Sequence, residues 1–230
     1  IATSAALAVG SYSFTAKAFD NGTTALSATS STQAVAVTAP PPTVSITANC
    51  TAPCNQAATV ALTANAAAAN GRSIAKVEFY DGAILLGSVT TSPYSLSRIG
   101  VAGGTHNYTA RAYDNSTPQL STTSANQAVA VNTPPTVSVV ASCAPPCTAP
   151  ATVTLSATAA DVDGAVSKVE FYRGATLLGT RNAAPWTLVE STAPAGSNSY
   201  TAKAYDNAAT PLGTTSAARS VTVGAATTTL

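Results

Sequence analysis

The sequence has little charge, few aromatic residues and no methionine. Charged residues make up 8% of the 230 residues and aromatic residues 6%, and ten basic against nine acidic side chains leave a formal net charge of +1. An ordinary soluble domain has about 25% charged residues. The chain therefore lacks the field that would attract nucleic acid or an anionic membrane. Because hydrophobic residues still reach 46%, mostly Ala and Val, we expect several thin layers rather than one thick globule.

Two further absences concern membranes and disorder. No run of about 18 apolar residues occurs, so we expect no membrane span, and the first residues lack the basic start and apolar stretch of a signal peptide. The high net charge that marks a disordered chain is also missing. We expect a folded chain that is solvated mainly by Ser, Thr and Asn.

The four cysteines form two close pairs. Cys50 lies four residues before Cys54, and Cys143 lies four residues before Cys147. A zinc site would need His or further Cys in range, and the only histidine, His106, lies in a different segment. The spacing therefore predicts two local disulfides, which implies an oxidising, extracellular compartment.

An internal repeat decides the architecture. Residues 76–87 read KVEFYDGAILLG and residues 168–179 read KVEFYRGATLLG, 92 positions later. Residues 108–115 (YTARAYDN) and 200–207 (YTAKAYDN) are again 92 apart, and residues 14–21 (FTAKAFDN) are a third copy. The chain therefore contains more than two copies of a unit of about 93 residues.

One period reads as a series of short β runs. In the last copy these runs are 136–141, 152–155, 166–172, 175–179, 186–189, 199–205 and 218–223. Strand alternation places Val169 and Phe171 on a core face and Lys168, Glu170 and Tyr172 on a solvated face. Seven short strands without a helical period indicate an antiparallel β-sandwich of two sheets.

The two repeated blocks resemble the bacterial immunoglobulin-like repeats that occur in tandem in secreted enzymes, adhesins and surface proteins. The resemblance covers essentially the whole chain and implies an all-β fold of tandem immunoglobulin-like antiparallel β-sandwiches, with about seven strands per repeat. It also suggests that Tyr108 and Tyr200 are tyrosine corners, whereas Phe14 in the first copy lacks the hydroxyl.

Proline runs mark the domain limits. They precede two complete repeats, at residues 39–132 and 133–224, and residues 225–230 are a tail or a linker to a next unit. Residues 1–38 match only the C-terminal half of a repeat, which would leave open sheet edges if it stood alone. Either the chain is part of a longer molecule, or another polypeptide supplies the missing strands.

The acidic residues fit structural roles better than catalysis. Glu78 and Glu170 lie on the outward face, where we expect cross-strand pairs with basic neighbours such as Arg111 or Lys203. The second repeated block has an aspartate at its last position but one in all three copies, namely Asp20, Asp114 and Asp206. Each precedes Asn, a pair that commonly caps a turn.

We find no enzymatic motif and predict no catalytic activity. His106 has Tyr12 and Asn198 as its repeat equivalents, and a catalytic base would not change type between copies. The sequence contains no nucleophile elbow, phosphate loop or metal-protease helix. We accordingly expect no cofactor, apart from one calcium candidate.

That calcium candidate is the run Asp161-Val162-Asp163-Gly164. Alternating carboxylates before a glycine turn offer hard oxygen ligands, but the equivalent stretch 69–72 in the middle repeat has no carboxylate. The alternative is a hydrogen-bonded turn between two strands.

Four tyrosines, Tyr80, Tyr113, Tyr172 and Tyr205, are predicted to point outward. They could stack on glycans or on neighbouring subunits, and the alternative is packing at strand ends. Strand alternation alone does not distinguish stacking on these partners from packing at strand ends.

Repetition without chemistry favours an extracellular structural protein. Tandem immunoglobulin-like repeats would form a stalk, fibre or filament, with self-association through a half repeat that a neighbouring chain completes by β-augmentation. The alternative is a spacer or carbohydrate-binding accessory region of a large secreted polysaccharide-degrading enzyme or adhesin, with polysaccharide as its partner.

Overall fold

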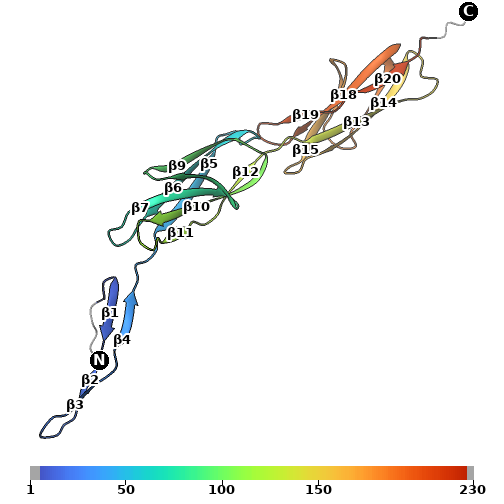
Figure 1. Cartoon of the computed structure of the whole chain (residues 1–230). Helices are drawn as coiled ribbons and strands as arrows, with labels where there is room; N and C mark the ends of the chain where they lie inside the picture. The colour runs from blue at the N-terminus through green and yellow to red at the C-terminus, as the bar shows by residue number, and fades with distance from the viewer. Residues whose placement is uncertain (1–5, 227–230) are drawn as a thin grey trace, which may run out of the picture.

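The computed structural model describes residues 6–226, and within them it contains β-strands and no helix. No helix in this part of the chain is therefore long and apolar enough to cross a membrane. One interrupted hairpin, in which the β1–β4 pair encloses the β2–β3 pair, and two β-sandwiches follow one another from the N-terminus to the C-terminus along an elongated path (Figure 1). Most of the tail predicted at residues 225–230 lies outside the described residues.

The middle sandwich has eight strands in two sheets. Its strands are β5 (Thr43–Cys50), β6 (Ala58–Ala67), β7 (Ile74–Asp81), β8 (Ile84–Val89), β9 (Tyr94–Val101), β10 (Gly104–Asp114), β11 (Ser121–Thr123) and β12 (Gln127–Val131). One sheet has the order β5-β6-β9. In the other, β8 pairs with β7 and β7 with β10, while β11 and β12 both pair with β10.

The last sandwich repeats this topology. Its strands are β13 (Thr136–Cys143), β14 (Ala151–Ala160), β15 (Val166–Arg173), β16 (Thr176–Arg181), β17 (Thr187–Ala193), β18 (Gly196–Asp206), β19 (Gly213–Thr215) and β20 (Arg219–Val223). One sheet has the order β13-β14-β17. The other joins β16, β15 and β18, with β19 and β20 on β18. The predicted all-β fold of tandem antiparallel sandwiches is confirmed.

The strand pattern of the sequence did not predict β19. In the structure the last strand of each sandwich is interrupted, and β19 is the short part that precedes the interruption. At the interruption Ser216 donates its backbone N–H to the carbonyl of Ala202, and the backbone N–H of Ala202 donates to Ser216 Oγ at 3.0 Å. These two bonds hold the chain against β18 across the interruption. β19 and β20 are therefore two parts of the seventh strand.

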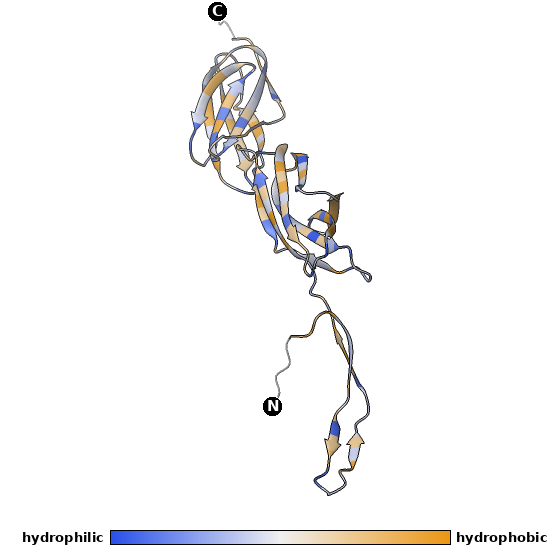
Figure 2. Cartoon of the chain, turned by 90° about the vertical axis from the view of Figure 1, so that its left-hand side faces the viewer, coloured by the Kyte–Doolittle hydropathy of each residue, from blue (hydrophilic) through white to orange (hydrophobic). Residues whose placement is uncertain are grey.

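The cores are thin and built largely from small side chains. In the last sandwich Val169 and Phe171 are fully buried, as alternation predicts, and they face Ala202 and Ala204, which are also fully buried. Figure 2 shows the resulting alternation of apolar and polar residues along the strands. A Cβ on Gly179 would approach Leu188 Cδ1 to 2.7 Å, so the glycine allows this leucine to fill the space beside the edge strand.

Residues 6–38 form only part of such a sandwich. β1 (Gly10–Phe14) pairs with β4 (Gln33–Val37), and β2 (Lys17–Phe19) pairs with β3 (Ser27–Thr29). Phe14 is 46% exposed, whereas its repeat equivalent Tyr108 is 1% exposed. In the described residues this half repeat therefore lacks the sheet that buries the same positions in the complete domains.

Candidate functional site

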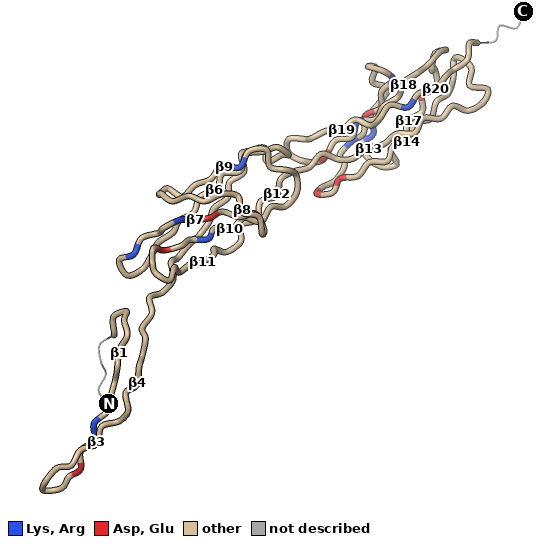
Figure 3. The backbone as a smooth tube through the Cα atoms, in the orientation of Figure 1, with Lys and Arg blue, Asp and Glu red and all other residues tan. Residues whose placement is uncertain are grey.

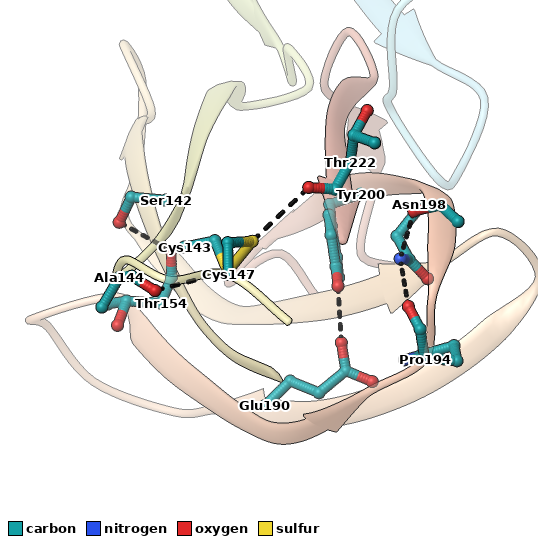
Figure 4. Close-up of a disulfide and its surroundings, with 11 residues drawn as sticks. Ser142, Cys143, Ala144, Cys147, Thr154, Glu190, Pro194, Asn198, Tyr200 and Thr222 are labelled. Atoms are coloured by element: carbon teal, nitrogen blue, oxygen red, sulfur yellow. Dashed lines mark hydrogen bonds between the residues drawn. A yellow bond between two sulfur atoms is a disulfide. The ribbon is translucent and has the colours of Figure 1, made fainter. Parts of the chain in front are cut away.

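Both cysteine pairs are disulfides. Cys50 is bonded to Cys54 and Cys143 to Cys147, each with Cα atoms 5.6 Å apart, and each closes the loop between the first two strands of its sandwich. Figure 4 shows the Cys143–Cys147 disulfide at the end of the last sandwich. The disulfide loop of the middle sandwich also holds the residue that follows β12, because Asn132 donates its N–H to the Cys54 carbonyl at 2.8 Å.

The two outward-facing glutamates are hydrogen-bonded by tyrosines. Glu78 accepts a hydrogen bond from Lys76 Nζ at 2.5 Å, and its Oε2 accepts from the hydroxyls of Tyr80 at 2.6 Å and Tyr113 at 2.7 Å. Glu170 repeats this cluster in the last sandwich. Its partners there are Lys168, Tyr172 and Tyr205.

The expectation of cross-strand ion pairs for these glutamates was wrong. Arg111 lies opposite Glu78 in the register, but its guanidinium bonds to Ser121 Oγ and lies over the Tyr113 ring. Lys203 lies opposite Glu170, but its Nζ lies over the Tyr205 ring. Neither glutamate is on a wet face, because Glu78 is 8% and Glu170 9% exposed. The tyrosine and lysine side chains that flank them exclude water.

These clusters shift the titration of their members. Burial raises the pKa of Glu78, but the hydrogen bonds from the ammonium group and the two hydroxyls outweigh it and bring the pKa to about 2. The same carboxylate raises the pKa of Tyr80 to about 12, and Glu170 does the same for Tyr172.

Two of the four tyrosine rings proposed for stacking, Tyr113 and Tyr205, already have a lysine ammonium group over one face. Lys76 Nζ lies 4.5 Å from the Tyr113 centroid, and Lys168 Nζ lies 4.3 Å from that of Tyr205. This geometry supports the packing alternative for these two residues. A glycan platform stays a prediction.

Three aspartates cap the same turn in the three repeats. Oδ1 of Asp206 accepts from the backbone N–H groups of Ala208 and Leu212, and Asp206 donates its own N–H to the Leu212 carbonyl. Asp114 and Asp20 make the corresponding pattern of bonds. The predicted Asx turn is confirmed, and the half repeat contains it in the same form as the complete domains.

In each repeat the side chain of the residue two positions before Phe14, Tyr108 or Tyr200 contacts a backbone carbonyl four residues earlier in the chain. The side chains of Tyr12, His106 and Asn198 contact the carbonyl oxygens of Ala8 at 2.7 Å, Ala102 at 3.0 Å and Pro194 at 2.9 Å. Three different polar groups thus make one contact. The tyrosine-corner assignment was wrong for Tyr200, whose hydroxyl donates to Glu190 Oε2 at 2.8 Å (Figure 4).

His106 is held between two acceptors. Its Nδ1 lies 2.6 Å from Asp81 Oδ2 and its Nε2 lies 3.0 Å from the Ala102 carbonyl, so the protonated ring can donate a hydrogen bond to both oxygens. Burial lowers the pKa of His106, but the bonds with Asp81 and Ala102 outweigh it and the net shift is upward. His106 is therefore part of an ion pair.

The two sandwiches are hydrogen-bonded to each other through the chain that joins them. Asn132 Nδ2 donates to Asp206 Oδ2 at 2.8 Å, and Asn55 Nδ2 donates to the Thr210 carbonyl at 3.3 Å. Thr133 donates from its backbone N–H to Asp163 Oδ2 at 2.9 Å and from its hydroxyl to Asp163 Oδ1. We did not predict a role for Asn132 from the sequence. The polar Asn-Thr pair before Pro134 distinguishes this junction from the first one, which has Thr38-Ala39 at the equivalent positions.

Asp161 and Asp163 lie in the turn between β14 and β15, as expected. Figure 3 shows how few charged residues the chain carries and places acidic ones on this loop. Among residues 6–226, no three His, Cys, Asp or Glu side chains are gathered into a ready metal site. Oδ2 of Asp161 is nevertheless buried without a hydrogen-bond partner. Burial, and then the neighbouring carboxylates of Asp163 and Asp206, raise the pKa of Asp161.

Comparison with known proteins gives one family and several similar structures. No curated protein matches the chain. Fibronectin(III)-like modules of Clostridium thermocellum CbhA are 24% identical, with 78% of this chain and 95% of that chain covered and a TM-score of 0.35. The human OSCAR ligand-binding domain is 17% identical, with 80% and 99% covered and a TM-score of 0.33.

The family match agrees with the repeat. The model of the bacterial Ig domain matches residues 42–110 and again residues 135–204, which together make up more than half of the chain. The two matches fall on the two complete sandwiches. The chain belongs to the bacterial Ig domain family.

Proposed function

We propose that this chain is part of an extracellular structural array, a stalk or fibre of Ig-like domains joined end to end, and that it has no catalytic role. The observation that carries this proposal is the hydrogen-bonded joint between the two sandwiches. The two disulfides support an oxidising, extracellular location. The polar clusters of the described residues support the absence of catalysis, because their members are bonded to one another.

The joint is held from both sides. The main chain of Asn132 is bonded to its own sandwich, donating to the Cys54 carbonyl and accepting from the Gln56 N–H, both at 2.8 Å. Its side chain bonds to Asp206 of the next sandwich. The following residues, Pro134 and Pro135, have restricted φ angles. A linker fixed in this way resists bending, which is what a stalk requires.

The half repeat supplies a means of extending the array. Ala16 donates its N–H to Ser30 Oγ at 3.0 Å and accepts from the Ser30 N–H at 2.8 Å, as the equivalent residues do in the complete domains. At this interruption the half repeat thus has the same backbone arrangement as the equivalent strands of the complete sandwiches. The apolar side chains of the half repeat, however, are exposed. These are Leu7, Val9, Phe14, Phe19, Leu26 and Val35.

The occupant of the face that bears Phe14 and Val35 is a set of strands equivalent to β5–β9. In the middle sandwich the equivalents of these two residues, Tyr108 and Val129, are buried in a core that also contains Val60, Leu62 and Phe79 of the covering strands. We place the completing strands on a neighbouring chain, which would make a head-to-tail contact that propagates into a filament. Strands of this kind would bury Phe14 as Tyr108 is buried.

Electron microscopy of the native material, together with its intact mass, tests the proposal. Uniform filaments built from a chain of about this length would support completion between chains. Beaded rods made of one much longer polypeptide would support the stalk and overturn the exchange of strands. Compact, unassembled particles would overturn both.

Carbohydrate binding is a second candidate function, with one observation in its favour. A shallow pocket of about 290 Å³ lies beside Tyr172 and is also lined by Thr201 and Lys203. A polysaccharide pull-down with the wild-type chain and with Tyr172→Ala tests it. Equal retention of the two proteins, or no retention of either, would contradict a role for this pocket.

A further inference from the structure

Two strands from different sandwiches have nearly the same sequence. The block 76–87 begins in β7 and the block 168–179 begins in β15, and the two blocks are identical at ten of their twelve positions. Their partner strands, β10 and β18, carry the other repeated block. Either strand could therefore pair with either partner in the same register and bury the same apolar side chains. Exchange of elements between neighbouring domains is a characteristic failure of repeat proteins.

One of the two differences between these blocks reverses a charge. Asp81 ends β7, and the equivalent residue Arg173 ends β15. The other difference, Ile84 against Thr176, lies at an exposed position and involves no charge. On a chain with only 8% charged residues, the reversal at the end of the strand is the one electrostatic difference between the two blocks.

The residue across the sandwich also reverses its charge. In the last sandwich Arg173 Nη1 forms an ion pair with Glu190 of β17, which belongs to the opposite sheet. The residue equivalent to Glu190 in the middle sandwich is Arg98 of β9, and the two residues have the same place in the register of their sheets. Both members of the pair are therefore inverted between the two domains.

A third position, next to this pair, differs in the same sense. His106 Nδ1 lies 2.6 Å from Asp81 Oδ2, and Arg98 is near enough to lower the pKa of His106. In the last sandwich the equivalent of His106 is Asn198, whose side chain donates to backbone carbonyls instead. We call these residues the charge sets, which are Asp81, Arg98 and His106 in the middle sandwich and Arg173, Glu190 and Asn198 in the last.

We propose that the two charge sets keep each strand in its own sandwich. If β15 took the place of β7, Arg173 would face His106 and Arg98, and three basic groups would meet without the present carboxylate. If β7 took the place of β15, Asp81 would face Glu190, whose side chain is 7% exposed, and that glutamate would lose its cation. A buried ion without its partner is strongly destabilising. Unfavourable charge contacts of this kind exclude a wrong partner.

Refolding of the intact chain from denaturant, with its disulfides retained, tests this proposal. The combined change Arg173→Asp, Glu190→Arg and Asn198→His gives the last sandwich the charge set of the middle one, so that each strand fits both places. Interrupted refolding, followed by the fluorescence of Trp186, counts exchanged molecules by their different unfolding rate. We expect their fraction to rise about tenfold over wild type, because the pairs are only partly buried.

Two further variants separate charge from sequence similarity. Thr176→Ile removes the other difference between the blocks and leaves both charge sets in place, so this control should refold as wild type does. The combined change Asp81→Arg, Arg98→Glu and His106→Asn gives the middle sandwich the charge set of the last one. This variant should again raise the exchanged fraction about tenfold.

Stability measurements test the pair itself, including the case in which a combined variant does not refold. Arg173→Asp alone should destabilise the last sandwich in denaturant unfolding, and the addition of Glu190→Arg should recover most of the loss. The absence of any recovery would overturn the proposal.

Two refolding results would also overturn it. These are an exchanged fraction equal to that of wild type in both combined variants, and an equal rise in the Thr176→Ile control. Exchange within one chain does not depend on protein concentration, whereas completion of the half repeat by a neighbouring chain does. The proposed function is therefore tested separately.

Discussion

Asn132 Nδ2 donates a hydrogen bond to Asp206 Oδ2 at 2.8 Å, and this bond ties the residue that follows the last strand of one sandwich to a fully buried aspartate in the next. The other oxygen of Asp206 caps its own turn. A single carboxylate therefore stabilises both the turn and the joint.

We predict that Asn132→Ala destabilises the last sandwich. The change leaves Asp206 Oδ2 buried without its partner, which costs about 1–3 kcal/mol. Denaturant unfolding measures this cost, and Thr38→Ala at the equivalent position of the first junction is the control, with an effect of about 0.5 kcal/mol or less. Equal effects of the two substitutions would contradict the assigned bond.

A second prediction concerns the pH dependence of the middle sandwich. His106 has its pKa raised on folding by Asp81 and Ala102, so its contribution is complete below the unfolded pKa of about 6.5. The contribution disappears as the pH rises through the higher folded pKa. We therefore expect the middle sandwich to lose stability from slightly acidic to alkaline pH.

His106→Asn serves as the matched variant for this prediction, because Asn is the residue of the last repeat and makes the same contact with the backbone. It should keep its fold and lose the pH dependence in this range. Unfolding measured across the range would refute the ion pair if wild type and variant had parallel profiles.

The third prediction concerns acid stability. Glu78 has its pKa lowered from 4.5 to about 2, so its stabilising effect is present above the unfolded pKa and is lost as the pH falls toward the folded pKa. Glu78→Gln removes hydrogen bonds to a charged group, each worth about 1.5–3 kcal/mol. The variant should be less stable at neutral pH.

The measurement is chemical unfolding of wild type and Glu78→Gln at neutral pH and at acidic pH. The difference between them should shrink as the pH falls, since protonation removes the same charge from the wild type. A difference that did not change with pH would show that packing, and not charge, holds the cluster together.

The fold could be predicted because the repeat and the strand alternation are local properties of the sequence. The buried face of Val169 and Phe171 followed from alternation, and the turns at Asp20, Asp114 and Asp206 followed from their position before Asn. Each of these features depends on neighbours in sequence or on a copy elsewhere in the chain.

The errors arise where partners are set by packing in three dimensions. Alternation places Glu78 and Arg111 opposite one another, but it cannot show that Tyr80 and Tyr113 reach over and take the carboxylate. The bond of Asn132 with Asp206 joins residues 74 positions apart in different domains. The polar Asn-Thr pair before Pro134 marks the junction, but no local pattern identifies Asp206 as the partner of Asn132.

The most direct test of the rigid joint is the measurement of residual dipolar couplings for the backbone amides of both sandwiches in the intact chain. If the joint is stiff, one alignment tensor will fit residues 43–131 and residues 136–223 together, and the combined change Asn132→Ala with Asp163→Ala will split it into two. Two different tensors in the wild-type chain would mean that the sandwiches reorient freely and would contradict the proposed stalk.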